Sequence, residues 1–366
     1  MYRSSSSISI KQIHWLLVFF ITSICLISVW NLHGTAGPHV GRVYINQIYW
    51  FLMGGGVMCI TALLNDHFIR RWTPFFYIGV MILLVLVLVI GKKVNGSRRW
   101  IDLGFFTFQP SELAKLAVIL ILASWFQNRP RPDGYQFIDL IPIGLLLALP
   151  MFLIFQEPDL GHTLMVFLIA LTMMSYEKFK RKTVIGALFA GIAFLPIAWN
   201  FLLKRYQKER ILTLIDGKVD RLGAGWHSYQ AEVAVGSGGL FGKGHLQGTQ
   251  VVGGFLPENH TDFVFAKWAE EYGLIGSSLV LFLYFALIVC ILYTAYTARD
   301  RFGTHVALGV GALLFWHVIM NVGMVINLLP VTGVTLPLMS YGGSSVLTVM
   351  IAFGLVLNVH ARRHIF

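Results

Sequence analysis

The feature that most constrains this chain is a series of apolar stretches that are long enough, or nearly long enough, to cross a lipid bilayer. A bilayer core about 30 Å thick is spanned by about 20 apolar residues in a helix. Hydrophobic residues make up 56% of the sequence and charged residues only 12%, which excludes an ordinary soluble domain. The sequence therefore predicts an all-α polytopic integral membrane protein with about ten transmembrane helices. The ten stretches lie near residues 13–30, 45–64, 75–90, 111–126, 138–155, 160–176, 183–203, 272–296, 304–329 and 340–360.

The distribution of lysine and arginine between the connections predicts the orientation of these spans. With ten spans, both termini lie on the same side of the membrane. The termini and the connections on that side hold 14 lysines and arginines, whereas the short connections on the other side hold five. Because cytoplasmic connections carry the excess of these residues, both termini are predicted to be cytoplasmic. The hydrophilic segment at about residues 204–263, between spans seven and eight, is then one large extracytoplasmic loop, and residues 1–366 form a single membrane domain.

Four of the five basic residues on the outer side crowd into one short connection, GKKVNGSRRW at residues 91–100. Two interpretations stay open. Basic residues near a membrane surface attract anionic lipid headgroups, or they form a site for phosphate or pyrophosphate, which arginine grips with paired hydrogen bonds. Under the second interpretation, Arg98 and Arg99 are candidate substrate contacts. Trp100 and the aromatic segment that it begins, WIDLGFFTF, are predicted to lie in the membrane interface.

The next predicted helix carries two charges within a membrane span. Pro110 suits its first turn, and Glu112 and Lys115 are three residues apart, so that they share one face of the helix. Charges within a span are costly and usually face the interior of the bundle or a wet cavity. An ion pair that only holds helices together is one interpretation. The position of the pair beneath the basic connection favours a cavity instead.

Two further clusters lie at the outer ends of spans. In QEPDLGHT, residues 156–163, Asp159 is expected to cap the next helix, with a direct chemical role as the alternative. In MSYGGSS, residues 339–345, the glycines either permit close helix packing or expose backbone amides to an anion, and the sequence favours neither. The candidate residues of this second cluster are Ser340, Gly342 and Gly343.

The stretch PENHTDFVFA, residues 257–266, puts two carboxylates and a histidine at the edge of an apolar segment. Asp262 is the deepest charge before this segment. It is either a cap of the following helix or a residue that binds or activates substrate, and the other outer clusters favour the second role. Glu258, His260 and Asp262 also offer metal-ligand atoms, although their spacing is not diagnostic of a metal site.

The long outer segment contains GSGGLFGKG, residues 236–244, which invites comparison with a nucleotide-binding loop. Its spacing matches neither GxxxxGK[ST] nor GxGxxG after a strand. We predict instead a flexible substrate or partner loop in which Lys243 is exposed.

Four motifs, taken in their order along the chain, resemble the SEDS family (shape, elongation, division and sporulation) of bacterial cell-wall proteins. They are NGSRRWIDLGFFTFQPSELAK, EPDLGHTL, LPENHTDFVFAKWAEEYGLIG and LPVTGVTLPLMSYGGSS. The resemblance extends over essentially the whole chain. The runs GKGHLQGTQ and LLPVTGVTLPL are more similar to the elongation branch of the family than to its division branch.

The resemblance implies a peptidoglycan glycosyltransferase of cell elongation. Such an enzyme polymerises lipid II, a lipid-linked disaccharide pentapeptide, at the outer face of the bacterial cytoplasmic (inner) membrane and releases undecaprenyl pyrophosphate. The implied partners are a class B penicillin-binding protein and other membrane proteins of the rod complex, and no nucleic acid is expected. Asp262 matches the essential outer-loop aspartate of the family. Trp100, Glu112, Lys115 and Asp159 match other positions that are functionally sensitive in the family.

The chemistry of this reaction suggests a role for each candidate residue. Asp262 either accepts the proton of a sugar hydroxyl as a base or organises a divalent cation, Mg²⁺ or Mn²⁺, and the sequence establishes no cofactor. Positive charge stabilises the departing pyrophosphate, for which Arg98, Arg99 and Lys115 are the candidate contacts. His260 is a further candidate for substrate binding.

Two other functions are consistent with much of the same evidence: a lipid II flippase, and a non-catalytic scaffold for a penicillin-binding protein. A flippase needs polar groups along a route through both leaflets, whereas the middle of the spans is nearly free of charge. A scaffold predicts that Asp262→Ala leaves function intact. The glycosyltransferase is therefore the favoured interpretation.

Overall fold

Each of the ten predicted apolar stretches corresponds to an α-helix in the computed structural model, which describes residues 13–33, 42–94, 97–102, 104, 106–215, 226–256 and 258–363. Among these residues, nine helices are long and apolar enough to cross a membrane, and α6 is a shorter apolar helix. The predicted all-α polytopic fold is confirmed. The ten helices are α1 (Trp15–His33), α2 (Val43–Leu63), α3 (Asp66–Ile90), α4 (Pro110–Asn128), α5 (Phe137–Gln156), α6 (Leu160–Ser175), α7 (Arg181–Ile197), α11 (Val264–Tyr296), α12 (Arg301–Val325) and α13 (Gly343–Ala361).

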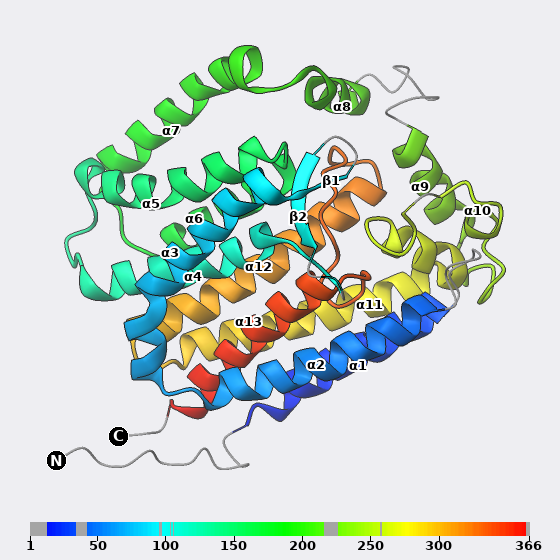
Figure 1. Ribbon diagram of the computed structural model, residues 1–366, viewed down its shortest axis with the longest axis horizontal. Helices are drawn as coiled ribbons and strands as arrows, with labels where there is room; N and C mark the ends of the chain where they lie inside the picture. The colour runs from blue at the N-terminus through cyan, green and yellow to red at the C-terminus, as the bar shows by residue number, and fades with distance from the viewer. Residues whose placement is uncertain are drawn as a thin grey trace.

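The helices differ in how deeply they lie in the bundle. In the most apolar windows of α4, α12 and α13, 72%, 67% and 83% of the residues are buried, so these three helices form the centre. The helix α7 and the short π-helix that continues it, η3 (Ala198–Leu202), have no buried residue in their window and run along the edge of the bundle (Figure 1). The centre therefore positions polar groups rigidly, while α7 presents its apolar residues outward.

The two ends of the bundle differ in structure. The start of α1 and the end of α13 lie at one end, which we call the termini end, as ten crossings require (Figure 1). The opposite end, which we call the sheet end, carries a small antiparallel sheet in the order β1-β2-β3. Lys93 pairs with Arg98 across β1 and β2, and Ile101 pairs with Phe108 across β2 and β3. The strands are β1 (Lys92–Val94), β2 (Ser97–Asp102) and β3 (Thr107–Phe108).

The segment WIDLGFFTF, predicted to lie in the membrane interface, contributes residues to strands β2 and β3 of this sheet. Strand pairing satisfies backbone donors and acceptors within Ser97–Asp102 and Thr107–Phe108. The sheet also ties the end of α3 to the start of α4. It thereby fixes the basic residues of β2 relative to the helix ends at this end of the bundle.

The long segment before α11 also belongs to the sheet end. It is hydrophilic and broken into short helices rather than one continuous helix. These helices are α8 (Arg205–Ile215), α9 (Trp226–Ser237) and α10 (Thr249–Val252).

The GSGGLFGKG loop is not the flexible segment with an exposed lysine that the sequence suggested. The Lys243 ammonium is half-buried and lies 2.8 Å from Oε1 of Glu270, a fully buried residue of α11. The amide of Lys243 donates to the Glu270 carbonyl as well, at 3.0 Å. Gly242 has a φ of +81°, and a side chain there would overlap the Glu271 carbonyl. The glycines therefore permit close backbone packing against α11.

Candidate active site at the sheet end

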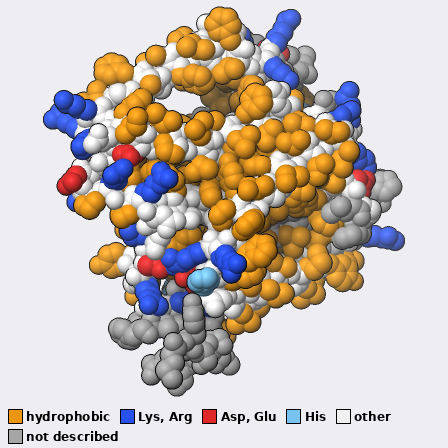
Figure 2. All heavy atoms as spheres, turned by 60° about the vertical axis from the view of Figure 1, so that its left-hand side comes forward, with side chains coloured by type: hydrophobic (Ala, Val, Ile, Leu, Met, Phe, Trp, Pro, Cys, Tyr) orange, Lys and Arg blue, Asp and Glu red, His pale blue; other side chains and the backbone are white. Residues whose placement is uncertain are grey.

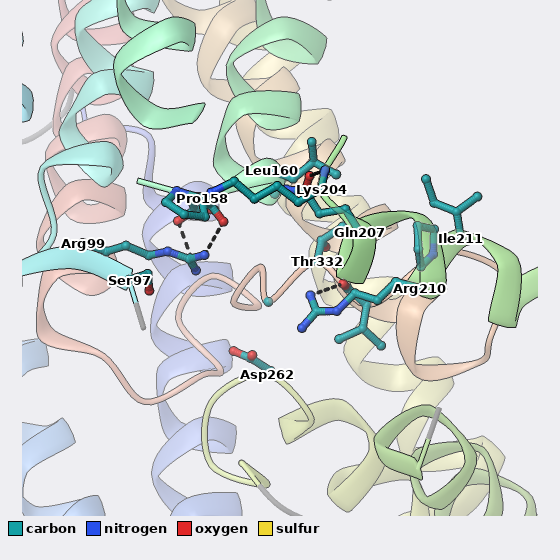
Figure 3. Close-up of a pocket in the computed structure, with 15 residues that line it drawn as sticks. Ser97, Arg99, Pro158, Leu160, Lys204, Gln207, Arg210, Ile211, Asp262 and Thr332 are labelled. Atoms are coloured by element: carbon teal, nitrogen blue, oxygen red, sulfur yellow. Dashed lines mark hydrogen bonds and ion pairs between the residues drawn. The ribbon is translucent and has the colours of Figure 1, made fainter. Parts of the chain in front are cut away.

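A polar cavity of about 530 Å³ opens at the sheet end, and we call it the sheet-end cavity. Four parts of the chain line it: β2, the turn between α5 and α6, the start of α8, and residues 330–333 before α13. Asp262 completes the lining from the loop before α11 (Figure 3). Segments that are far apart in the sequence therefore surround one carboxylate.

The backbone of the loop that carries Asp262 is held in place by α12 and the segment before α13. The Asp262 carbonyl accepts a hydrogen bond of 2.9 Å from Nδ2 of Asn321. The Thr261 carbonyl accepts one of 2.6 Å from Oγ of Ser340, and the His260 carbonyl accepts one of 2.8 Å from the Tyr341 amide. Three consecutive carbonyls are thus fixed, so the Asp262 side chain has a defined position.

The Asp262 carboxylate points toward the cavity rather than capping a helix (Figure 3). The N-cap position of α11 is Phe263, and no side chain caps that helix. Within the described part of the chain, no group donates a hydrogen bond to the Asp262 carboxylate. Burial, followed by the negative charge of Glu258, raises the pKa of Asp262 to about 6. A carboxylate with these properties is suited to accept a proton near neutral pH.

Of the two neighbouring arginines, the structure brings only Arg99 to the cavity. Nε of Arg99 donates to the Glu157 carbonyl at 3.0 Å, and Nη2 donates to the Pro158 carbonyl. Arg98 is exposed, and its Nη1 donates to the Leu88 and Val89 carbonyls at the end of α3, at 3.2 and 3.1 Å. A cation is favourable at a helix C-terminus, which gives Arg98 a structural role there.

Asp159 is the N-cap of α6, as expected, and it also lines the cavity. Its Oδ1 accepts from the His162 amide at 3.1 Å, and its Oδ2 lies 3.0 Å from Nδ1 of His162 and 3.6 Å from Nη1 of Arg99. Burial opposes ionisation, but the nearby positive charge of His162 is strong enough to lower the pKa of Asp159. Asp159 is therefore an anion that forms an ion pair with Arg99 on the buried side of the guanidinium.

A buried polar network continues from Asp159 into the bundle. Nε2 of His162 lies 2.8 Å from Oε1 of Glu112, and Oε2 of Glu112 lies 3.0 Å from Nζ of Lys115. Nε2 of His162 hydrogen-bonds to Glu112, and Nδ1 lies near the Asp159 carboxylate without a hydrogen-bond partner. Two carboxylates this close favour the positively charged form of the ring. Charges of opposite sign alternate from Arg99 through Asp159, His162 and Glu112 to Lys115.

Beyond Lys115, the network reaches the segment before α13, whose residues 330–333 line the cavity. Nζ of Lys115 lies 2.9 Å from Nε2 of His317 on α12, and Nδ1 of His317 lies 3.0 Å from the Thr335 carbonyl. Glu112 and Lys115 are buried and do not line the sheet-end cavity, which corrects the expectation that they face it. Through His162 and His317, they connect the turn between α5 and α6 with the segment before α13.

The other predicted residues lie outside the cavity lining. Trp100 is half-buried in β2, and His260 is half-buried with its ring 6.1 Å from the Tyr341 ring. Gly342 is the N-cap of α13. A side chain at Gly343 would lie 2.6 Å from the Trp50 ring of α2, which supports close helix packing as its role. Ser340 acts through the Thr261 carbonyl described above.

The candidate metal ligands do not form a metal site with one another. Among the described residues, no three histidine, cysteine, aspartate or glutamate side chains come together in a way that holds a metal ion. Glu258 is exposed, and its Oε2 accepts a hydrogen bond of 3.0 Å from Oγ1 of Thr261. A cation at Asp262 would therefore take its other ligands from water, backbone carbonyls or substrate phosphates.

Sequence reasoning missed the wall that the start of α8 provides. Lys204, Gln207 and Arg210 line the cavity opposite Arg99 (Figure 3). Nη1 of Arg210 donates to the Val331 carbonyl at 2.8 Å, which joins α8 to the 330–333 segment. The run KRYQKER, residues 204–210, is a polar stretch next to a span, and its high charge was the signal available in the sequence.

The fold and the site define a polytopic membrane protein with a polar cavity, held by buried charges, at one end of its bundle. The sequence model of the FtsW/RodA/SpoVE family, described as "Cell cycle protein", matches residues 8–365. The chain therefore belongs to this family, the SEDS family that its motifs resemble.

Individual relatives agree with this membership. The peptidoglycan glycosyltransferase MrdB of Escherichia coli K12 is 38% identical, over 95% of this chain and 93% of the relative. A chain from a structure on the coordination of polymerization and crosslinking by a peptidoglycan synthase complex is 31% identical with a TM-score of 0.83, over 97% of this chain and 99% of that one. The crystal structure of the rod shape determining protein RodA of Thermus thermophilus is 29% identical with a TM-score of 0.72, over 96% and 98%.

Proposed function

We propose that this protein is a peptidoglycan glycosyltransferase that polymerises lipid II into glycan strands during cell elongation. The observation that carries the proposal is the Asp262 carboxylate in the sheet-end cavity, with a raised pKa and with Arg99 and the start of α8 on opposite sides. The glycosyltransferase activity of the MrdB relative from Escherichia coli supports the same reaction class.

The proposed reaction is a single displacement at an anomeric carbon. A sugar hydroxyl oxygen forms the new bond to that carbon while the bond from the carbon to the undecaprenyl pyrophosphate oxygen breaks. Asp262 takes the hydroxyl proton, and Arg99 stabilises the charge that develops on the departing pyrophosphate. The configuration inverts, and no covalent nucleophile is needed.

The surroundings of this reaction are part of the proposal. We infer that the sheet end faces the cell exterior or periplasm and that the protein lies in the bacterial cytoplasmic membrane, since the lysine and arginine bias places the termini inside. The structural similarity to a chain of a peptidoglycan synthase complex supports a class B penicillin-binding protein as partner. Other membrane proteins of the rod complex are proposed as further partners.

A divalent cation, Mg²⁺ or Mn²⁺, is a proposed cofactor that would bind in the cavity together with substrate. Such cations are commonly bound by one or two carboxylates and the phosphates of a substrate. Asp262 would be the carboxylate, and the pyrophosphate of lipid II would supply the remaining charged oxygens. A bound cation would neutralise the pyrophosphate.

The flippase alternative gains no support from the positions of the intramembrane charges. Glu112, Lys115 and His317 are buried and bonded to one another rather than arranged along an open route. We therefore keep the glycosyltransferase as the proposed function.

The two neighbouring arginines provide a matched test of the pyrophosphate contact. Arg99→Gln is expected to lower kcat/KM for lipid II by about ten- to hundredfold, because a hydrogen bond to a charged group contributes about 1.5–3 kcal/mol. Arg98→Gln removes the same charge one residue away, but outside the cavity, and should stay within about threefold of wild type. Steady-state polymerisation assays on the two purified variants compare them. Equal losses would contradict the assignment of Arg99.

The raised pKa of Asp262 predicts an acid limb in the pH–rate profile. A base acts only when deprotonated, so kcat/KM should fall as the pH is lowered through about 6, rather than near the usual aspartate pKa. Glu258→Gln removes a negative charge that raises this pKa, so its limb should move to lower pH. Arg98→Gln serves as the control and should leave the limb in place. A wild-type limb near the usual aspartate pKa of about 4 would contradict the raised pKa of Asp262.

A further inference from the structure

A second cavity, of about 220 Å³, lies at the termini end, and we call it the termini-end cavity. The start of α3, the link between α11 and α12, and the end of α13 surround it. It is separate from the sheet-end cavity and shares no lining residue with it. Figure 2 faces this end and shows charged side chains of both signs gathered together, with apolar surface beside them.

The two acids of the termini-end cavity are already engaged. Oδ2 of Asp66 lies 2.8 Å from Nε of Arg70, and Asp300 pairs with Nη2 of the same arginine. Asp300 also accepts from the Gly303 amide at 2.9 Å and so caps α12. Asn65 accepts from the His67 amide at 3.1 Å and caps α3. The Gly303 amide of α12 and the His67 amide of α3 are therefore already hydrogen-bonded and do not bind a ligand.

Two further arginines leave positive charge in the cavity. Arg299 is exposed, and no hydrogen bond or ion pair engages its side chain within the described part of the chain. Arg362 donates from Nη2 to the Leu64 carbonyl at 2.7 Å, while its Nε is buried without a hydrogen-bond partner among the described residues. With three arginines against two aspartates, the lining carries a net charge of +1. A buried unpaired guanidinium N–H is costly unless an acceptor reaches it.

The location of this cavity favours a lipid as the source of that acceptor. It lies at the ends of membrane-spanning helices, and Phe68 and Trp72 in the first turns of α3 are 47% and 51% exposed. Exposed aromatic residues at helix ends mark the level of the lipid headgroups. Guanidinium groups match phosphate geometry, and basic pockets between transmembrane helices bind phospholipid headgroups.

We propose that the termini-end cavity binds a phosphate group, and that this phosphate belongs to the headgroup of an anionic phospholipid. Arg299 and Arg362 are the residues that contact it. Because α3, α12 and α13 meet at this cavity, a bound headgroup joins their ends. This site does not depend on the proposed glycosyltransferase activity.

Titration of the purified full-length chain with phosphatidylglycerol, followed by native mass spectrometry, tests the site. Each arginine near a charged lipid contributes about 1 kcal/mol, so Arg299→Gln should weaken binding of the first lipid about fivefold. Adding Arg362→Gln should raise the loss to about 25-fold. The exposed Arg299 side chain makes no hydrogen bond or ion pair among the described residues, so Arg299→Gln is expected to fold. If the double variant does not fold, the affinity of the single variant is the test.

The control removes two exposed charges from the same end of the bundle, outside the cavity, in Arg71→Gln with Lys178→Gln. This variant should bind the first phosphatidylglycerol within about twofold of wild type. Equal weakening in the control and in the cavity variants would overturn the proposal, as would unchanged binding in Arg299→Gln. Equal affinity for phosphatidylcholine with the same acyl chains would exclude an anionic headgroup. Displacement of the lipid by equimolar inorganic phosphate would identify a free anion as the ligand instead.

Discussion

Asp262→Asn is expected to lower the rate of glycan synthesis from lipid II by about 10²- to 10⁴-fold, the usual contribution of a positioned general base. Asparagine keeps the size of the side chain but cannot accept the hydroxyl proton. The loop itself should stay in place, because its hydrogen bonds to Asn321, Ser340 and Tyr341 use backbone carbonyls. The measurement is polymerisation of purified lipid II by the protein together with the proposed penicillin-binding protein partner.

The control for this experiment is Asn259→Ala in the same loop. Among the described residues, the Asn259 side chain donates to the Leu256 carbonyl alone, at 3.2 Å, and it does not line the sheet-end cavity. This variant should polymerise lipid II at close to the wild-type rate. Both variants must show the same unfolding temperature and the same complex formation as wild type. Full activity of a folded Asp262→Asn complex would remove Asp262 from the chemistry and would favour the scaffold or flippase interpretation.

A chelator separates the two proposed roles of Asp262. If the carboxylate acts directly as a base, wild-type activity should survive removal of divalent cations. If it organises a cation with the substrate pyrophosphate, activity should be lost and should return when Mg²⁺ or Mn²⁺ is restored. A low rate in Asp262→Asn is expected under both roles, so the chelator result on wild type is the informative one.

The transmembrane helices could be predicted from the sequence because the requirement behind them is local. A span needs a sufficient run of apolar residues, and that run is visible without knowing what packs against it. The sheet was missed although the sequence contained a signal for it. Asn95–Gly96 between two short runs is a common hairpin-turn pair. The high aromatic content of the following segment pointed to the interface and concealed the pairing.

The candidate site could be predicted only in part, because side-chain direction depends on local structure. Arg98 and Arg99 were predicted as equivalent contacts, but successive residues of a strand point to opposite faces, so only one of them reaches the cavity. Asp262 and Asp159 were found because each is a charge beside a span. Lys204 and Arg210 were missed because their position depends on how α8 folds back over the bundle, and no local pattern encodes this.

The sequence predicted the Glu112–Lys115 pair beneath the cavity, but not the two histidines that extend it into a network. Glu112 and Lys115 are three residues apart on one helix, so their contact follows from helical spacing. His162 and His317 join them from α6 and α12, 50 residues from Glu112 and 202 residues from Lys115 along the sequence. Such contacts arise only from the packing of these helices on α4. The buried pair is thereby linked to two walls of the cavity.

Lys115→Met is expected to destabilise the protein by about 3–5 kcal/mol, the usual cost of breaking a buried ion pair by removing one partner. Methionine fills a similar volume, so the loss arises mainly from the charge and not from a void. Oε2 of Glu112 then has no positive partner, and Nε2 of His317 loses the ammonium donor that lies 2.9 Å away. The measurement is the free energy of unfolding in detergent, and Lys93→Met at an exposed position is the control.

The double variant Glu112→Gln with Lys115→Met tests whether the loss comes from the unpaired charge. Glutamine keeps a hydrogen-bond acceptor for His162 but carries no charge, so the double variant should be more stable than the sum of the two single losses predicts, by about 1–3 kcal/mol. Additive losses would show that Glu112 and Lys115 act independently. The double variant should nonetheless polymerise lipid II slowly, because His317 loses its hydrogen bond from Lys115. His317 contacts the Thr335 carbonyl, two residues beyond the cavity-lining Gly333, and so positions this wall of the cavity. Recovered stability without recovered activity would separate the folding role of the ion pair from its positioning of the cavity wall.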